Sequence, residues 1–220
     1  MKNIIIRGLC TAVVSSNLYA VTYDGTNLLN LDGADWAVVD NTGKAVVAGT
    51  GIAASGYFNT FTDAQVESAT LSGVSSLIAD FVILGSGDFN GYTTDGLYNF
   101  SENVTNPGGT PSLVGKKFYT FFGNKTTLET SLQIGLYQSL AVIDAGGGPD
   151  PVEYTINMPD GGSAIFGSEL THGKVQIDAT DLGGGPAFMT DSFTLEVVPE
   201  PSSLALLGLG LVGFTLRRRR

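Results

Sequence analysis

The sequence predicts a mainly β protein, with an antiparallel sandwich or jelly-roll-like body, one or two short helices and a C-terminal apolar helix. Two observations predict the body. The chain has 30 glycines in 220 residues, about twice the usual share of roughly 7%, and many follow Asp or Asn in pairs typical of tight turns. Short runs of β-branched and aromatic residues lie between these pairs. Frequent turns between short strands favour a sandwich.

The first 20 residues are predicted to be a secretory signal peptide. Lys2 and Arg7 precede or interrupt an apolar stretch at residues 4–14, and Ala20 is a small residue at a suitable cleavage point. We therefore expect export through the Sec machinery and cleavage after Ala20 by signal peptidase. The competing interpretation is a first buried strand. Cleavage would remove Cys10, the single cysteine, and leave a body without disulfides.

The body, residues 21–198, is predicted to begin with a β-hairpin. Residues 36–40 and 44–48 have strand character and flank an Asn-Thr-Gly loop of three residues. Further runs with strand character follow, at residues 117–122, 131–139, 163–166, 174–177 and 193–198. At about 178 residues the body is long enough to bury a core as one domain.

One region of the body departs from the strand pattern. Thr62 and Gln65 have the spacing of a capping box, and apolar residues then recur three or four positions apart until Gly85. We expect one or two short helices within residues 63–84. These helices are expected to cover one face of the sheet.

The last 22 residues combine a proline-flanked glutamate, an apolar run and a basic end. They comprise Pro199, Glu200 and Pro201, then the apolar residues 202–216, then Arg217, Arg218, Arg219 and Arg220. Prolines break a preceding element, an apolar run enters hydrocarbon, and arginines stop it at the cytoplasmic interface. A helix of the apolar run would be about 22 Å long, short of a hydrocarbon thickness of roughly 30 Å, so snorkelling or local thinning would accommodate it. The competing interpretation is a buried helix of the body.

This tail resembles the PEP-CTERM sorting tail of exopolysaccharide-producing Gram-negative bacteria. The resemblance covers about a tenth of the chain. It implies recognition by an exosortase, a membrane transpeptidase that cuts near the Pro-Glu-Pro, and transfer from the inner membrane to the cell surface or extracellular matrix. Exopolysaccharide is then a candidate partner. The early hairpin, the helical insert and the later strands also resemble uncharacterised exported PEP-CTERM proteins, which implies no activity.

The charge of the body restricts its partners. Residues 21–198 keep five of the 11 basic residues and 20 of the 21 acidic ones, so the net charge is about −15. A protein binds nucleic acids and anionic lipid surfaces through Lys and Arg side chains, so the excess of acidic residues argues against both kinds of partner. It is compatible with cations and with neutral sugars.

Candidate catalytic and metal-binding residues are few. His172 is the single histidine, so one chain cannot build a two-histidine metal site, and we expect an exposed turn residue before Gly173. Asp88, Asn90 and Asp95 place oxygen ligands close together, as Ca²⁺ favours, but their spacing does not match an EF-hand and turn chemistry explains them. We expect no cofactor.

A G-x-G-x-x-G pattern at residues 208–213 lies inside the apolar tail. It has no strand before it and no chain after it for a ribose-binding carboxylate, so it does not predict a dinucleotide site.

Three functions stay open for the body. The favoured one is a non-enzymatic surface or matrix protein with a structural or adhesive role. The second is a carbohydrate-binding module, because Trp36, Tyr92 and Tyr98 lie in or near Gly/Asp-rich segments where rings can stack on sugars. The third is a glycan-processing enzyme, which needs two carboxyl groups roughly 5 to 9.5 Å apart in a cleft.

Overall fold

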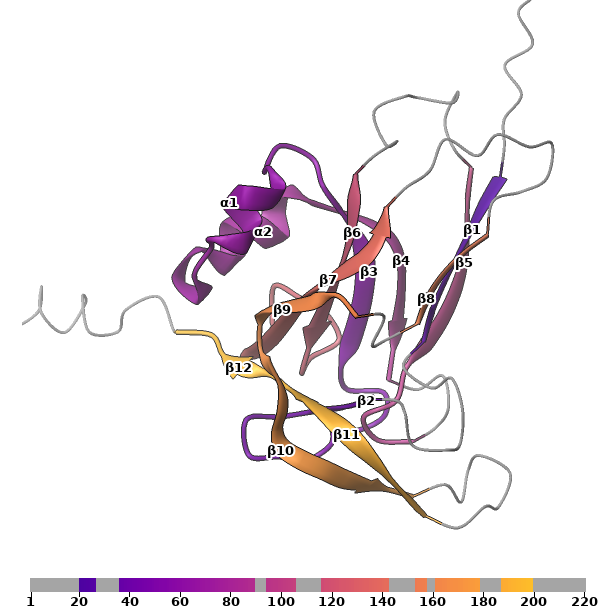
Figure 1. Cartoon of the computed structure of the whole chain (residues 1–220), viewed down its shortest axis with the longest axis vertical. Coiled ribbons are helices and arrows are strands. Elements are labelled where there is room, and N and C mark those ends of the chain that lie inside the picture. Colours follow the sequence, from indigo (N-terminus) through magenta and orange to yellow (C-terminus); the bar gives the residue numbers. More distant parts are fainter. Residues whose placement is uncertain are drawn as a thin grey trace, which may run out of the picture.

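A computed structural model describes seven segments of the chain, at residues 20–26, 36–89, 94–105, 116–142, 153–157, 161–178 and 187–199. These segments form three β-sheets and a short helical insert (Figure 1). The mainly β fold with short helices is therefore confirmed. Residues 1–19 of the 20-residue predicted signal peptide lie outside the described residues, and so does the predicted C-terminal helix.

The central sheet has six strands. Its order is β12-β7-β6-β3-β4, with β9 also paired to β7, and all of its pairs are antiparallel. The strands are β3 (Ile52–Phe58), β4 (Phe81–Asp88), β6 (Lys117–Gly123), β7 (Gln133–Val142), β9 (Ser163–Phe166) and β12 (Glu196–Val197).

Two three-stranded sheets flank the central one. One has the order β5-β1-β8 and lies beside β4; the other has the order β10-β11-β2 (Figure 1). Their strands are β1 (Ala20–Thr26), β5 (Asn99–Thr105), β8 (Glu153–Asn157), β10 (Ser168–Ile177), β11 (Phe188–Thr194) and β2 (Trp36–Val39). Each flanking sheet contains one parallel pair, β1 with β8 and β11 with β2. The pairing is thus mostly, not wholly, antiparallel.

The helical insert consists of α1 (Asp63–Glu67), a 3₁₀ turn η1 (Leu71–Gly73) and α2 (Val74–Asp80), and it covers one face of the central sheet (Figure 1). The capping box is confirmed: Gln65 N–H donates to the Thr62 hydroxyl, and Thr62 N–H donates to the Gln65 side chain. The prediction of helix through residue 84 is wrong from Phe81 onward. There the chain pairs with β3 and becomes β4, as expected for a run rich in aromatic and β-branched residues.

The predicted hairpin forms only in part. Residues 36–39 are β2, but residues 44–48 are not a strand, and Val39 and Ala45 form an isolated bridge. The backbone of Gly96 explains this, because it accepts a hydrogen bond from Val38 N–H at 2.9 Å and donates one to the Val46 carbonyl at 2.7 Å. Gly96 therefore pairs with the Val38 N–H and the Val46 carbonyl, which would bond to each other in a longer hairpin.

The later strand predictions hold with two adjustments. β6, β7, β9 and β10 contain or overlap the predicted runs, whereas the run at residues 193–198 is divided at Leu195 between β11 and β12. β1, β3, β5 and β8 were not predicted. Within the described residues, no helix has the length and apolar character that crossing a membrane requires.

Two large buried clusters, and a small one of Ala37, Leu97 and Ile177, lie among the described residues. The aromatic core lies on one side of β6 and contains Trp36, Val38, Val46, Ala53, Leu84, Phe89, Tyr98, Phe100, Phe118, Phe122, Tyr137, Phe193 and Leu195. The helix-side core lies under the insert and contains Ala54, Phe58, Val66, Val74, Leu77, Tyr119, Phe121, Leu128, Ile134, Leu136 and Phe166.

Candidate functional site at the exit of the C-terminal tail

The tail leaves the body from an edge strand. β12 pairs antiparallel with the start of β7, with Glu196 opposite Ile134 and Val197 opposite Gln133. The ladder continues for one more residue, because Val198 N–H donates to the Leu132 carbonyl at 2.9 Å. Pro199 is exposed and has no N–H to continue the ladder. The body therefore fastens the chain up to Val198.

The start of β7, on which β12 rests, is itself fixed by side chains. The Asn124 side-chain oxygen accepts hydrogen bonds from the backbone N–H groups of Leu132 and Gln133, each at 3.0 Å. The Gln133 side chain accepts one from Asn41 N–H at 2.8 Å. The Glu196 carboxylate accepts one from Gly167 N–H at 2.9 Å. Three separate segments thus hold the exit in place.

The exit is apolar on both of its sides. Val198 is half-buried and packs against the helix-side core, where it lines a cavity of about 110 Å³ together with α2 and the β6–β7 loop. The side chains of Leu132 and Val197 instead face outward and are 57% and 52% exposed. Exposed apolar side chains of this size at the start of a sorting tail are candidates for a contact outside the body.

The predicted sorting residues lie at or beyond this exit. Pro199 is the last described residue, while Glu200, Pro201 and the arginines from Arg217 to Arg220 lie outside the described residues. At the other end, Ala20 is the first residue of β1 and pairs with Thr105. Cleavage after Ala20 stays a prediction.

Two of the three predicted oxygen ligands, Asp88 and Asp95, lie among the described residues. Asp88 ends β4 and is exposed, and Asp95 accepts a hydrogen bond from Ala48 N–H at 2.9 Å. Asn90 lies outside the described residues. Asp95 also lines a cavity of about 590 Å³ with Lys44 and Asp178. In the part of the chain that the structure describes, no group of three or more His, Cys, Asp and Glu side chains could hold a metal ion.

Two of the three aromatic residues predicted to stack on sugars are buried. Trp36 and Tyr98 are 3% and 1% exposed and pack in the aromatic core, so neither presents a ring face to solvent. Tyr92 lies outside the described residues. His172 is exposed, as predicted, but it belongs to β10 and lies against the turn at Gly43, where a Cβ atom would come within 2.8 Å of its ring.

A polar network that the sequence analysis did not predict joins α1 to the central sheet. Tyr119 hydroxyl donates to Asp63 at 2.7 Å, and Gln138 donates to both the Tyr119 oxygen and the Glu67 carboxylate at 3.0 Å each. Lys117 forms a 3.4 Å ion pair with the same carboxylate. Tyr119 and Gln138 are cross-strand partners on β6 and β7, and no local pattern reveals such a pairing.

This network sets the ionisation of two of its members. Burial raises the pKa of the Tyr119 phenol well above its ordinary value, and the hydrogen bond to Asp63 adds to the shift. Hydrogen bonds from Gln138 and Lys117 lower the pKa of the Glu67 carboxyl. Glu67 is therefore held as a carboxylate and Tyr119 as a neutral phenol.

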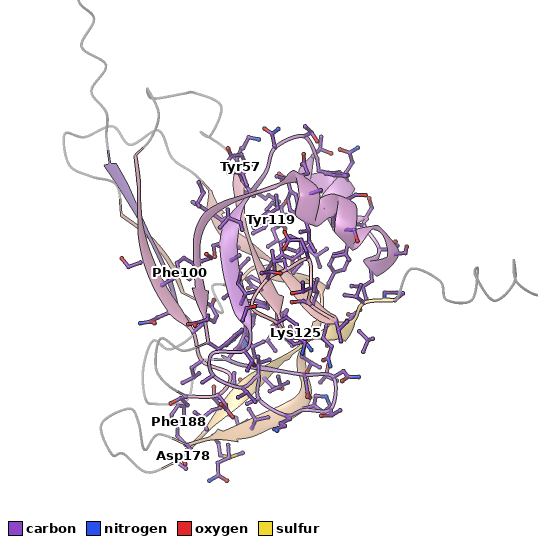
Figure 2. All side chains as sticks on the ribbon, turned by 180° about the vertical axis from the view of Figure 1, so that it is seen from behind. Tyr57, Phe100, Tyr119, Lys125, Asp178 and Phe188 are labelled. Atoms are coloured by element: carbon purple, nitrogen blue, oxygen red, sulfur yellow. The ribbon has the colours of Figure 1, made fainter. Side chains whose placement is uncertain are left out.

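A further cavity adjoins the network. It has a volume of about 240 Å³, and Tyr57, Phe61, Asp63, Lys116 and Tyr119 are among its lining residues. Tyr57 and Tyr119 both lie near the helical insert (Figure 2). The Lys116 ammonium group lies 4.7 Å from the centroid of the Tyr57 ring, a cation–π contact.

Comparison with known proteins identifies the tail. Residues 197–220 match the family model of the PEP-CTERM protein-sorting motif. No curated protein and no solved structure matches the chain. The motif implies an exported protein that an exosortase processes at the membrane, and its match begins at Val197, inside β12. The chain therefore carries a PEP-CTERM sorting motif that starts where the folded body ends.

Proposed function

We propose that the protein is exported, held in the inner membrane by its C-terminal tail, and then moved by an exosortase to the cell surface or extracellular matrix. The observation that carries the proposal is the match of residues 197–220 to the sorting motif. The geometry supports it, because the body fastens the chain through Val198 and leaves Pro199 exposed. A processing enzyme could then reach the Pro-Glu-Pro without unfolding either core.

The N-terminal end supports export. β1 begins at Ala20, so removal of the predicted signal peptide would leave the strand from Val21 onward in its pairing with β5 and β8. The single cysteine, Cys10, lies before this point. The exported body would fold without disulfides and depend on its two cores.

The test is the intact mass of the protein in the membrane, surface and culture fractions of its own host. We expect a species that begins at Val21 and ends near Pro199 outside the inner membrane. Replacing Pro199, Glu200 and Pro201 together by alanine should retain the full-length mature protein in the membrane. Surface delivery of that variant at the normal level would contradict the proposal.

For the body we propose a non-enzymatic structural or adhesive role. What supports this at the cavity of about 240 Å³ is that the adjoining Glu67 carboxylate is already bound by Gln138 and Lys117, which lower its pKa, so this residue is unsuited to act as a general acid there. A general acid at neutral pH needs the opposite shift. Hydrolysis of glycans by the purified protein at enzymatic rates would refute this role.

The second candidate for the body is carbohydrate binding at the cavity of about 240 Å³. This cavity combines the half-buried rings of Tyr57 and Phe61 with the polar groups of Asp63 and Thr62, a mixture typical of small-ligand sites. Retardation in polysaccharide gels tests it: Tyr57→Ala should abolish the retardation and Lys174→Ala should keep it, because Lys174 lies on β10 and does not line the cavity. Equal migration of the wild type with and without polysaccharide would remove this candidate.

A further inference from the structure

We propose that, in the membrane-held precursor, the body docks on the bilayer interface through an exit face formed by Leu132, Val197 and Pro199. This inference rests on the proposed function, because it takes the apolar run of the tail as the membrane segment. It adds an orientation and a lipid contact for the body, neither of which the sorting motif implies.

The tether between the body and the apolar run is short. The body fastens the chain through Val198, and the apolar run begins at Ser202. Four residue steps span at most about 14 Å, even when fully extended. The headgroup layer on each side of the hydrocarbon accounts for roughly 5 to 8 Å of that distance. The exit face is therefore confined to the headgroup layer or to at most about 6 to 9 Å above it.

The exit face presents apolar side chains to its surroundings. Leu132 and Val197 are the side chains brought nearest to the membrane by the tether, and they are 57% and 52% exposed. Val197 pairs with Gln133, and Leu132 lies opposite Val198, so Leu132 and Val197 are diagonal neighbours that flank the exit at the same end of the sheet edge. Transfer of branched apolar side chains out of water is favourable, by roughly 1.5 to 3 kcal/mol for complete burial of each. At the membrane interface both side chains can leave water for the apolar part of the bilayer.

The contact between the exit face and the bilayer can be weak, because the tail already holds the body at the membrane. Two apolar side chains are too few to hold a free protein on a membrane, but the tail makes the contact intramolecular and raises its effective concentration. The body carries a net charge of about −15, so anionic lipids repel it and any attraction to the bilayer is apolar. The contact is therefore apolar, and it ends when the tail is cut.

The choice of lipid over the processing enzyme follows from the same tether. Lipid surrounds the apolar run at all times, whereas an exosortase meets each chain only for processing. Tether length alone brings lipid to the exit face, without any complementary protein surface. Docking on the enzyme is the competing outcome of the experiment.

The experiment uses single-cysteine labels, because the exported precursor, residues 21–220, has no cysteine of its own. Leu132→Cys reports on the exit face. Leu140→Cys is the matched control: Leu140 is also on β7 and is 67% exposed, and it lies eight residues further along, about 26 Å in an extended strand. Each variant carries an environment-sensitive fluorophore and is reconstituted into phosphatidylcholine vesicles that contain a lipid-bound quencher.

We expect a blue shift and loss of emission at position 132 and neither at position 140. Flotation with the vesicles is measured on the same samples. A precursor that floats but shows equal emission at the two positions would overturn the exit-face contact and leave the sorting proposal standing. A change at position 132 that needs added exosortase would overturn it in favour of the enzyme. A precursor that fails to float would refute the membrane role of the tail and this inference with it.

Discussion

The aromatic core and the helix-side core lie on opposite faces of β6, and they differ in what they connect. Phe118 and Phe122 point into the aromatic core, whereas Tyr119 and Phe121 alternate with them and point into the helix-side core. The aromatic core is a set of packed rings. The helix-side core instead borders the polar network of Tyr119 and reaches the tail exit through Val198. One face thus provides stability, and the other joins the sheet, the helices and the sorting tail.

The largest expected effect comes from the aromatic core. Phe193 is fully buried, and its ring centroid lies 5.3 Å from that of Trp36 and 5.2 Å from that of Phe122. Phe193→Ala should lower the free energy of unfolding by about 3 to 5 kcal/mol, because it removes a large ring from a close-packed cluster.

Phe121→Ala is the matched change on the other face, since Phe121 is also fully buried and lies in the helix-side core. Denaturant unfolding followed by fluorescence measures both variants. An equal loss from the two substitutions would show that the faces contribute alike to stability and would remove the distinction.

The second effect is smaller and belongs to the polar network. Tyr119→Phe removes the hydroxyl that donates to Asp63 and accepts from Gln138. We expect a loss of about 1 to 2 kcal/mol, because buried partners are left unsatisfied, together with faster hydrogen exchange in α1. Unchanged exchange in α1 would mean that the network does not hold the helix to the sheet.

The same residue predicts an alkaline limit of stability. The pKa of Tyr119 is raised by burial and by the hydrogen bond to Asp63, so above the ordinary tyrosine pKa of about 10 the folded state binds more protons than the unfolded state. Stability should therefore fall as the pH rises through this range. Tyr119→Phe should flatten the fall.

The contrast between the two faces also marks what sequence can predict. The capping box at Thr62 and the strands β6 and β9 follow from local patterns of a few residues, and they were predicted. β3 reads Ile-Ala-Ala-Ser-Gly-Tyr-Phe, which alternates weakly because both of its faces are buried. The parallel pair of β11 and β2 joins Asp191 to Trp36, and such distant pairing depends on tertiary packing.

The candidate site divides in the same way. The sorting motif is a continuous segment, so its composition alone predicts it. The fastening of Val198 depends on Leu132, and the network depends on Tyr119, Asp63 and Gln138, which three different elements supply. No local pattern marks these residues. Trp36 and Tyr98, chosen from turn composition, are core residues because β2 and the segment before β5 turn them inward.

The third effect concerns the loop that leads into the helical insert. The Asp80 carboxylate accepts hydrogen bonds from the Thr60 hydroxyl and from the backbone N–H groups of Thr60 and Phe61. Burial alone would raise the pKa of Asp80, but these hydrogen bonds outweigh it and lower the pKa. Asp80→Asn should cost about 1 kcal/mol at neutral pH, below the usual range for hydrogen bonds to charged groups because the carboxylate is partly exposed.

The pH dependence gives the control for Asp80. A lowered pKa contributes stability above the ordinary aspartate value, and that contribution is lost as the pH falls through the folded-state pKa. The difference between wild type and Asp80→Asn should therefore vanish in acid. A difference that persists at low pH would assign the effect to packing rather than to charge.

The smallest effect has the opposite sign and lies on β11, next to the aromatic core. The hydroxyl groups of Ser192 and Thr194 are buried and have no hydrogen-bond partner among the described residues. They occupy the face of β11 opposite Phe193, where a methyl group would fill the same space without a desolvation penalty. Thr194→Val should raise the free energy of unfolding by up to about 1 kcal/mol. A loss of stability would mean that the Thr194 hydroxyl does have a hydrogen-bond partner in the folded protein. The face of β11 opposite Phe193 would then be a paired polar contact.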